Sequence, residues 1–319
     1  RWPDPYSRST EPQHVRSSNP HESTGQQHRT HNENTDQQQP VQKRSKSTDE
    51  IADAYAEVAD KLARWQHLDR LFTGRYRCRQ FRHANGRVLD VACGTGQNFR
   101  YLPSASQVVG IDISDEMLAH ARTEFDRLEV DGTVHQMDAQ ALDFPDDSFD
   151  LVGCQALLIN LPDPGRALRE FARVARDRVA CIEPDNGAVT VASSVDSESR
   201  LAGVARRRYL EGIDTDVTLG ADATDLFREA GLSNVTTARY DQTLRVEPPY
   251  TAGDVRAVGR KASGAGLRER RDTMVSSEEA LDSLRASWRE MGREALEQLK
   301  NDDYRRTETV PFYVTVGEL

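Results

Sequence analysis

A carboxylate and two closely spaced glycines stand together in the segment Arg87–Pro103, RVLDVACGTGQNFRYLP. The residues before the glycines favour a strand that is covered on both faces of a parallel sheet, and they are Val88, Leu89 and Val91. Asp90 places a carboxylate among them. Gly94 and Gly96 lack a Cβ and tolerate a positive φ, so the backbone can approach a ligand closely there. A helix that begins near Gln97 would direct its free N–H groups at the same space, so the segment predicts a nucleotide-sized pocket.

The spacing of the glycines separates two kinds of nucleotide site. A dinucleotide fingerprint, G-x-G-x-x-G, needs a third glycine, but Gly96 is followed by Q-N-F. An NAD-dependent oxidoreductase is therefore the least favoured function. The segment Asp90–Gly96 instead resembles motif I, D/E-x-G-x-G-x-G, of the class I S-adenosylmethionine (SAM) dependent methyltransferases. Ala92 stands at the first glycine of that motif, and VACGTG resembles the ubiquinone/menaquinone C-methyltransferase branch, also called methyltransferase type 11.

Further segments resemble the same family in the same order. Gln107–Asp112 is a second strand that ends in an acid, and Ser114 is a fitting N-cap for the next helix. A carboxylate at a strand end can accept from both hydroxyls of a ribose, and the resemblance implies that role for Asp112. Taken alone, Asp112 could equally be a capping or turn acid. The third strand leads into Asp138, which matches the family's adenine-contacting acid, although it lies in an aspartate-rich stretch where solvated loop acids are common.

The resemblance continues through a fourth strand over Ser148–Ala156 and a fifth over Val179–Asp185. It implies a donor site at the carboxyl ends of these strands, which would bind SAM and release S-adenosylhomocysteine. Met117 is also a typical core residue. The implied members of the donor site are Tyr55, Asp90, Ala92, Cys93, Gly94, Thr95, Gly96, Asn98, Asp112, Ile113, Met117, Asp138, Ala139, Cys154 and Gln155.

The alternation of strands and helices with short loops predicts a parallel sheet, because parallel neighbours need crossover helices. Together with the resemblance, it predicts a Rossmann-like α/β fold. We expect seven strands, mostly parallel, with an antiparallel last strand over Val310–Val316, helices on both faces and a helical cap. The clearest helices are Pro164–Val174 and Glu278–Lys300, where apolar residues recur on one side.

The composition divides the chain into a tail and a folded domain. Residues 1–46 are rich in Gln, Ser, Thr and Asn without an apolar period, so we expect a disordered polar tail. Residues 47–319 are expected to form the methyltransferase domain. Tyr55 would cover the donor or pack within an amphipathic helix. The expected parts of the domain are N-terminal lid helices over 47–85, a SAM-binding core over 86–186, a cap segment over 187–220 and a helical insertion over 251–300 that forms a second lid or an oligomer surface.

The charge of the chain favours a small-molecule partner. The net charge is −10, and since acidic and basic residues balance in 1–50, residues 51–319 carry it. An acidic fold without a basic, aromatic stripe disfavours nucleic acid as a partner. We expect a small-molecule methyl acceptor and a monomer or homodimer. Arginine greatly outnumbers lysine, and with the acidity this indicates a halophile or a GC-rich organism.

The cysteines and histidines do not indicate a metal site. Cys78, Cys93, Cys154 and Cys181 lack C-x-x-C spacing, which disfavours zinc and a disulfide framework. The histidines of the polar tail are more typical of solvated chain than of a metal site. No apolar run approaches the ~20 residues of a spanning helix. Without a visible signal segment, we expect a cytoplasmic protein that spans no membrane.

Methyl transfer from a sulfonium is an in-line displacement with a neutral leaving group, so the site mainly orients and desolvates the reactants. A base is needed only if the acceptor loses a proton. The weak candidates are Glu183, Asp185 and His135, and the first two are also ordinary turn formers in E-P-D. We expect a SAM-dependent methyltransferase that acts on a small molecule, with quinone-like acceptors among the options. The alternative is a SAM-binding regulatory protein of the same fold without turnover.

Salt dependence tests the halophile interpretation. Added KCl screens the self-repulsion of an acidic fold, so we expect the melting temperature to rise from low to molar KCl. Thermal unfolding followed by circular dichroism measures this. A melting temperature that stays flat across the same range would rule the interpretation out.

Overall fold

The computed structural model of the chain describes residues 86–102, 105–128 and 131–319. Contacts divide the chain into two units, Arg1–Arg44 and Ser45–Leu319, and every described residue belongs to the second. The predicted polar tail over 1–46 and the predicted lid helices over 47–85, which include Tyr55, lie outside the described residues.

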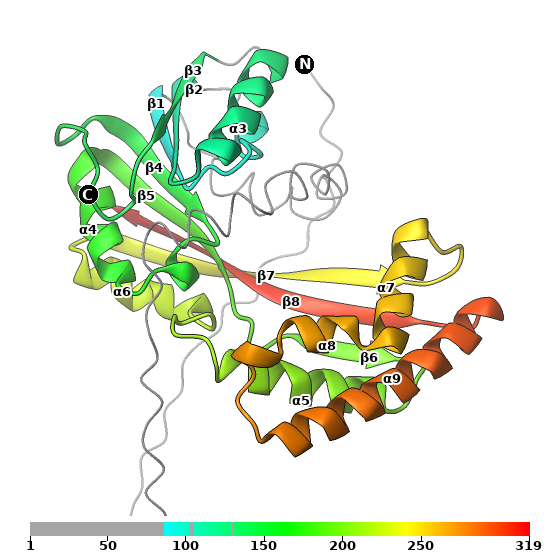
Figure 1. Cartoon of the computed structure of the whole chain (residues 1–319). Helices are drawn as coiled ribbons and strands as arrows, with labels where there is room; N and C mark the ends of the chain where they lie inside the picture. Colours follow the sequence, from blue (N-terminus) through cyan, green and yellow to red (C-terminus); the bar gives the residue numbers. More distant parts are fainter. Residues whose placement is uncertain (1–85, 103–104, 129–130) are drawn as a thin grey trace, which may run out of the picture. The chain divides into compact units, whose positions relative to one another are not determined.

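A mixed sheet of eight strands forms the centre of the described part of the chain, in the order β3-β2-β1-β4-β5-β8-β6, with β7 paired to β8 (Figure 1). All antiparallel pairs involve β8 (Arg306–Glu318), which lies beside β5, β6 (Thr190–Ser193) and β7 (Ser233–Val246). The predicted, mostly parallel Rossmann-like sheet with an antiparallel last strand is confirmed. The parallel strands are β1 (Gly86–Val91), β2 (Ala105–Asp112), β3 (Gly132–Gln136), β4 (Phe149–Gln155) and β5 (Ala175–Pro184).

Strand β6 is the addition to the predicted seven. It pairs with Arg306–Thr309 of β8, whereas the pairing of β5 stops at Phe312. Strand β6 therefore pairs with the part of β8 that extends beyond β5. Its sequence, TVAS, is too short to show a strand period, so it is not among the seven strands that the sequence predicts.

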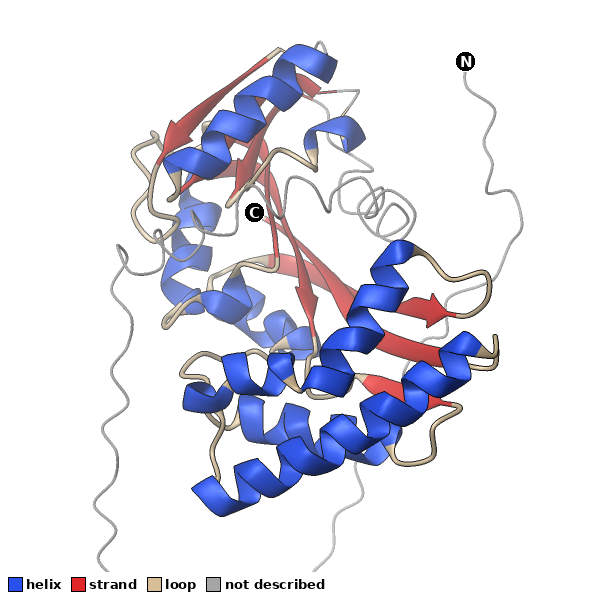
Figure 2. Cartoon of the chain, turned by 45° about the vertical axis from the view of Figure 1, so that its right-hand side comes forward, coloured by secondary structure: helices blue, strands red, loops and turns tan. Residues whose placement is uncertain are grey.

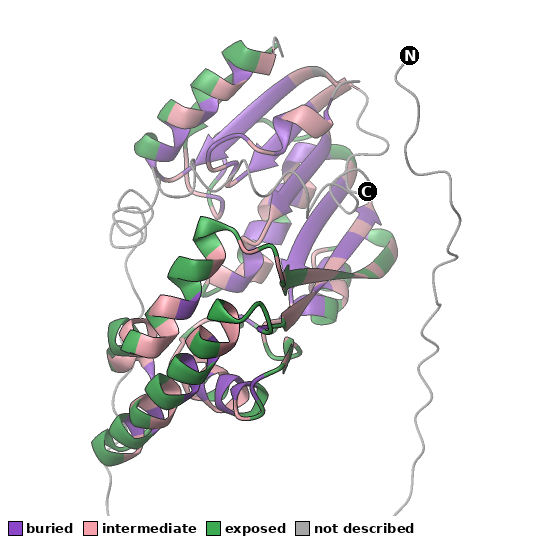
Figure 3. Ribbon diagram, turned by 90° about the vertical axis from the view of Figure 1, so that its right-hand side faces the viewer, coloured by how far each residue is buried: buried purple, intermediate pink, exposed green. Residues whose placement is uncertain are grey.

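Helices cover both faces of the sheet, as predicted. Val88 packs in one buried cluster and its neighbour Leu89 in another, because successive strand residues point to opposite faces. On the Val88 face lie η1 (Phe99–Tyr101) and α3 (Asp115–Leu128). On the Leu89 face lie α4 (Pro164–Val174) and α6 (Ala223–Glu229). The strands between these helices are mostly buried, and the outward helix faces are exposed (Figure 3).

The helix predicted to begin near Gln97 is not an α-helix. After Gly96 the chain makes turns and then the short 3-10 helix η1, which ends at Leu102 with φ −113° and ψ 40°. The sequence continues with Pro103, which disfavours helical backbone at the preceding residue. The segment between glycine and proline is too short to offset the cost of helix nucleation.

A second group of helices packs on the part of β7 and β8 that lies beyond β5 (Figure 2). The predicted boundaries of Glu278–Lys300 agree with α9, and the predicted cap segment contains α5. Among the described residues, none of these helices combines the length and the apolar character that crossing a membrane requires. The elements are α5 (Glu198–Leu210), α7 (Ala252–Ser263), α8 (Ala265–Glu269), η4 (Arg271–Thr273) and α9 (Glu278–Lys300), whereas η3 (Gly220–Asp222) contacts α6, β5 and β8.

A buried carboxylate joins this group to the sheet. Glu198 of α5 is 1% exposed and accepts hydrogen bonds from Ser193 Oγ at 2.6 Å and Tyr304 OH at 2.9 Å. Lys261 of α7 and Arg306 of β8 form ion pairs with the same carboxylate. Burial acts to raise the pKa of Glu198, but Lys261 and the hydrogen bonds from Ser193 and Tyr304 outweigh it and hold the pKa below its usual range. One charge therefore connects α5, α7 and β8, and its removal would take an ion-pair partner from two largely buried cations.

Two glycines in this group provide a test of its packing. A Cβ on Gly292 of α9 would overlap the backbone of Ala262 in α7, whereas a Cβ on Gly259 of α7 would meet nothing within 4 Å. We expect Gly292→Ala to lower the free energy of unfolding by about 1–3 kcal/mol through overpacking. The control Gly259→Ala should raise it by about 0.5–1 kcal/mol through helix propensity. Urea unfolding measures both, and equal effects would contradict the close approach of α7 and α9.

Candidate functional site

The carboxyl ends of β1, β2 and β4 meet at one edge of the sheet. Val91, the last residue of β1, pairs with Ile111 of β2 on one side and with Cys154 of β4 on the other. The loops that follow these strands are therefore neighbours. Open α/β sheets bind ligands at such an edge, where neighbouring connections leave in opposite directions.

The glycine-containing loop after β1 has left-handed backbone at three positions, with φ of 54° at Ala92, 55° at Gly94 and 81° at Gly96. Gly96 N–H donates to Cys93 O at 2.9 Å and closes the turn. Ala92 therefore adopts the conformation for which the family motif uses glycine, at a cost of roughly 1–2 kcal/mol. The sequence departs from the motif in residue type, while the backbone keeps a glycine-like conformation.

Asp112, at the end of β2, holds this loop. Its Oδ2 accepts from Gly94 N–H at 2.9 Å, and its Oδ1 accepts from Ser114 N–H at 3.0 Å. The residue is 8% exposed. Burial raises the pKa of Asp112, and the backbone donors oppose that shift. Each carboxylate oxygen has a second acceptor position, so ribose hydroxyls could still donate to this group.

Asp90 and Asn98 form a buried pair behind the loop. Asn98 Nδ2 donates to Asp90 Oδ1 at 3.1 Å, and the residues are 5% and 0% exposed respectively. The side-chain oxygen of Asn98 is buried and, within the described residues, has no hydrogen-bond donor. A buried acceptor of this kind is costly unless a donor reaches it, which makes it a candidate contact for a bound ligand.

The two loop glycines have different surroundings. A Cβ on Gly94 would meet nothing within 4 Å, so this residue faces open space. A Cβ on Gly96 would lie 2.5 Å from the ring of Phe99, which stacks on Phe125 of α3 with the centroids 3.9 Å apart. Packing therefore requires glycine at 96, while at 94 the missing side chain leaves room beside the loop.

The remaining donor-site candidates differ in accessibility. Ile113 is half-buried, whereas Met117 is 3% exposed and its N–H donates to Ser114 Oγ at 3.3 Å, which confirms Ser114 as the N-cap. Asp138, after β3, is half-buried and accepts from Gln140 N–H at 2.8 Å, so its carboxylate also shapes a turn. The other buried side chains of the predicted set are those of Cys93 (6% exposed), Thr95 (5%), Ala139 (8%) and Cys154 (0%), and Gln155 is half-buried.

Glu183, at the end of β5, was the first weak candidate for a base, and its side chain is 0% exposed. Its carboxylate accepts N–H groups from the segment that contains η2 (Leu158–Asn160), directly after β4. Burial raises the pKa of Glu183 to about 7. In this conformation Glu183 has no surface to offer an acceptor, and its side chain contacts the loop and Cys154 of β4.

The other two candidate bases, Asp185 and His135, do not form a common site with Glu183. Asp185 Oδ1 accepts from Gly187 N–H at 2.9 Å and Ala188 N–H at 3.0 Å, the pattern of a turn-forming aspartate. His135 is exposed on β3. Strands β2, β1 and β4 lie between β3 and β5, so His135 is roughly 19 Å from Glu183 across the sheet. The structure therefore does not bring the three candidates together.

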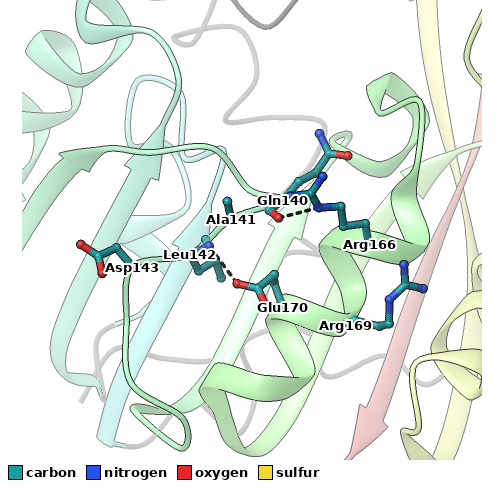
Figure 4. Close-up of a pocket in the computed structure, with 7 residues that line it drawn as sticks. All are labelled: Gln140, Ala141, Leu142, Asp143, Arg166, Arg169 and Glu170. Atoms are coloured by element: carbon teal, nitrogen blue, oxygen red, sulfur yellow. Dashed lines mark hydrogen bonds between the residues drawn. The ribbon is translucent and has the colours of Figure 1, made fainter.

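A shallow groove of ≈ 450 Å³ was not predicted from the sequence (Figure 4). Leu142 N–H donates to Glu170 Oε2 at 2.9 Å, and Arg166 Nε donates to Gln140 O at 3.1 Å. These bonds tie the loop after β3 to α4. The only sequence signal was the recurrence of polar residues on one side of α4. The groove is lined by Gln140, Ala141, Leu142, Asp143, Arg166, Arg169 and Glu170.

Part of the chain is similar to known methyltransferases. Residues 89–182, from β1 to β5, match the model described as "Methyltransferase domain". The chain is 43% identical over 93 residues to a phosphatidylethanolamine N-methyltransferase of Cereibacter sphaeroides, covering 28% of this chain and 46% of that protein. It is 33% identical over 144 residues to a ubiquinone/menaquinone biosynthesis C-methyltransferase of a Marinomonas species, covering 40% of this chain and 57% of that protein.

The chain spans about half the length of the first curated relatives that it matches, with 46% and 56% of two of them covered. The solved structure of YcgJ from Bacillus subtilis aligns with a TM-score of 0.42 at 17% identity, covering 73% of this chain and 92% of that chain.

The loop glycines yield a stability prediction. We expect Gly96→Ala to lower the free energy of unfolding by about 1–3 kcal/mol more than Gly94→Ala, since both place alanine at positive φ but only the first displaces Phe99. Urea unfolding of the two variants measures the difference. Equal losses would show that the stacked rings do not set the shape of this loop.

Proposed function

We propose that the protein transfers a methyl group from SAM to a small-molecule acceptor, because residues 89–182 match a methyltransferase domain model and the chain resembles curated methyltransferases. The observation that carries the proposal is the loop after β1. Asp112 holds Gly94 in a left-handed conformation, with open space on the side of the missing Cβ. Backbone can approach a nucleoside closely at such a position.

The described residues suit the chemical groups of the donor. Asp112 has acceptor positions for ribose hydroxyls beside its bonds to Gly94 and Ser114. Asn98 offers a buried oxygen that suits an ammonium donor. We assign the donor site to the set predicted from the sequence, with Tyr55 as its predicted cover. Its other members are Asp90, Ala92, Cys93, Gly94, Thr95, Gly96, Asn98, Asp112, Ile113, Met117, Asp138, Ala139, Cys154 and Gln155.

Bound SAM would supply an electrophilic methyl group on a sulfonium. The part of the protein is then to orient the two reactants and exclude water, because the leaving group is neutral. Burial raises the pKa of Cys93 and Cys154, so both thiols near the site stay protonated and do not compete as nucleophiles. The buried Glu183 and the turn-forming Asp185 give no support to a general base, which suits an acceptor that needs little proton removal.

We further propose a hydrophobic, quinone-like acceptor, in a protein that acts in the cytoplasm as a monomer or homodimer. The support for the acceptor is the similarity to a ubiquinone/menaquinone biosynthesis C-methyltransferase over 144 residues. The cap helices α5, α7 and α9 are the part of this chain that would select the acceptor.

The donor assignment is tested by Asp112→Ala. We expect this variant to bind SAM and S-adenosylhomocysteine at least tenfold more weakly, because hydrogen bonds to a charged carboxylate contribute about 1.5–3 kcal/mol each. It should also unfold more easily, since Gly94 and Ser114 lose their acceptor. Isothermal titration calorimetry with both nucleosides gives the affinities.

The matched control is Asp115→Ala, which removes an exposed carboxylate three residues away that forms a surface ion pair with Arg122. Its affinity should remain that of the wild type. Unchanged affinity in Asp112→Ala would overturn the ribose assignment, and a wild type that binds neither nucleoside would overturn the donor. Donor binding without S-adenosylhomocysteine production from any acceptor would favour the regulatory alternative.

A further inference from the structure

Glu183 concentrates three consecutive backbone donors on one buried carboxylate. Its Oε1 accepts from Leu157 N–H at 3.1 Å and Leu158 N–H at 3.0 Å, and its Oε2 accepts from Ile159 N–H at 3.4 Å. All three donors belong to the segment after β4, whereas Glu183 ends the neighbouring strand β5. One side chain of β5 therefore fixes the loop of β4.

The loop that Glu183 holds is strained. Ala156 has a φ of 51°, in the left-handed region that disfavours residues with a Cβ. Its N–H donates to Ile182 O at 2.8 Å, and its carbonyl accepts from Asn160 Nδ2 at 2.7 Å. Such a conformation persists only where the surroundings enforce it, and strain of this kind clusters at functional sites.

The loop lies at the donor edge of the sheet. Cys154 of β4 pairs with Val91, the residue directly before the loop that carries Gly94. Residues 155–160 therefore begin beside the proposed donor site. A shift of this loop would alter the wall of the site while leaving the contact between Gly94 and Asp112 unchanged.

We infer that Glu183 is a positioning residue, whose ionised carboxylate sets residues 155–160 against the donor site through the amides of Leu157, Leu158 and Ile159. The inference rests on the proposed function, because it takes the edge beside Gly94 as the donor site. Glu183 has no exposed surface, so it would act through the loop that it holds.

Protonation of Glu183 would weaken its hydrogen bonds to the loop. A neutral carboxyl carries a hydrogen on one oxygen and can no longer accept on both as a carboxylate does. Burial raises the pKa of Glu183 to about 7, so the change falls near neutral pH. Among the described residues, the titratable groups that face this carboxyl are Cys154 on β4, Cys181 on its own strand and Tyr313 opposite on β8. The pKa values of both cysteines are raised, so neither thiol titrates in the same range.

The effects on loop position and on global stability have opposite signs. Since the folded pKa lies above the unfolded value, Glu183 contributes stability that is present below the unfolded pKa and is lost as pH rises through about 7. The loop, in contrast, is held best above pH 7, where the carboxylate is charged. A purely structural role therefore predicts no loss of ligand affinity on acidification, whereas a positioning role predicts one.

The test combines amide exchange with ligand affinity in the full chain. In the wild type, we expect the protection factors of Leu157, Leu158 and Ile159 to fall at least threefold between pH 8 and pH 5.5, with a midpoint near 7. The probe S-adenosylhomocysteine should bind at least threefold more weakly at the lower pH, as measured by calorimetry. Exchange rates are divided by the intrinsic rates at each pH.

The variant Glu183→Gln keeps the shape of the side chain but does not titrate, and its amide nitrogen cannot accept from Ile159 N–H. In this variant we expect neither amide protection nor the affinity for S-adenosylhomocysteine to change with pH. The affinity should stay weak at every pH. The control Asp177→Asn removes an exposed carboxylate at the other end of β5 and should behave as the wild type.

The results of this test distinguish the proposed function from the positioning role of Glu183. Failure of the wild type to bind S-adenosylhomocysteine at any pH would overturn the proposed function and this inference with it, whatever the amides show. Binding with an affinity that is flat across pH, or a transition near 7 that survives in Glu183→Gln, would overturn the inference alone. The wild-type exchange data require no variant, so they decide the point even if Glu183→Gln does not fold.

Discussion

The carboxylate of Asp112 is the contact on which the site depends. It receives the N–H of Gly94 from the loop after β1 and the N–H of Ser114 from the start of α3, so one side chain fixes two connections that leave neighbouring strands. The left-handed turns at Ala92, Gly94 and Gly96 are costly for a free chain. Asp112 helps to offset that cost and keeps the loop in place before a ligand arrives.

A second buried carboxylate holds a neighbouring loop at this edge of the sheet. Asp112 ends β2 and holds the loop of β1, while Glu183 ends β5 and holds the loop of β4. In both cases burial raises the pKa of a carboxyl that accepts backbone N–H groups. Because β1 and β4 are adjacent, the two loops lie next to each other, and acids of the flanking strands hold them from either side.

The regular elements could be predicted from the sequence because their signals are local. The boundaries predicted for Pro164–Val174 and Glu278–Lys300 are those of α4 and α9, and Ser114 is the N-cap that its position predicts. The prediction of a helix after Gly96 was wrong, because Pro103 leaves too few residues for α-helical turns. Strand β6 was missed because it depends on β8, more than a hundred residues further along the chain.

The candidate site was predicted in part for the same reason. The glycine spacing and the acid at the end of β2 are visible in the sequence, so the residues around Gly94 and Asp112 could be named. The partners of Glu183 could not, since its contact with Leu157–Ile159 arises only when β4 and β5 pair. An acid followed by proline reads as a turn former, and nothing local in the sequence shows that the fold buries it.

A crystal structure with S-adenosylhomocysteine would test the central claim most directly. The account predicts the ribose hydroxyls within hydrogen-bond distance of Asp112, the nucleoside against the open side of Gly94, and the Asp112 bonds to Gly94 and Ser114 preserved. A nucleoside bound elsewhere, or a carboxylate that releases Gly94 to reach the ligand, would contradict it.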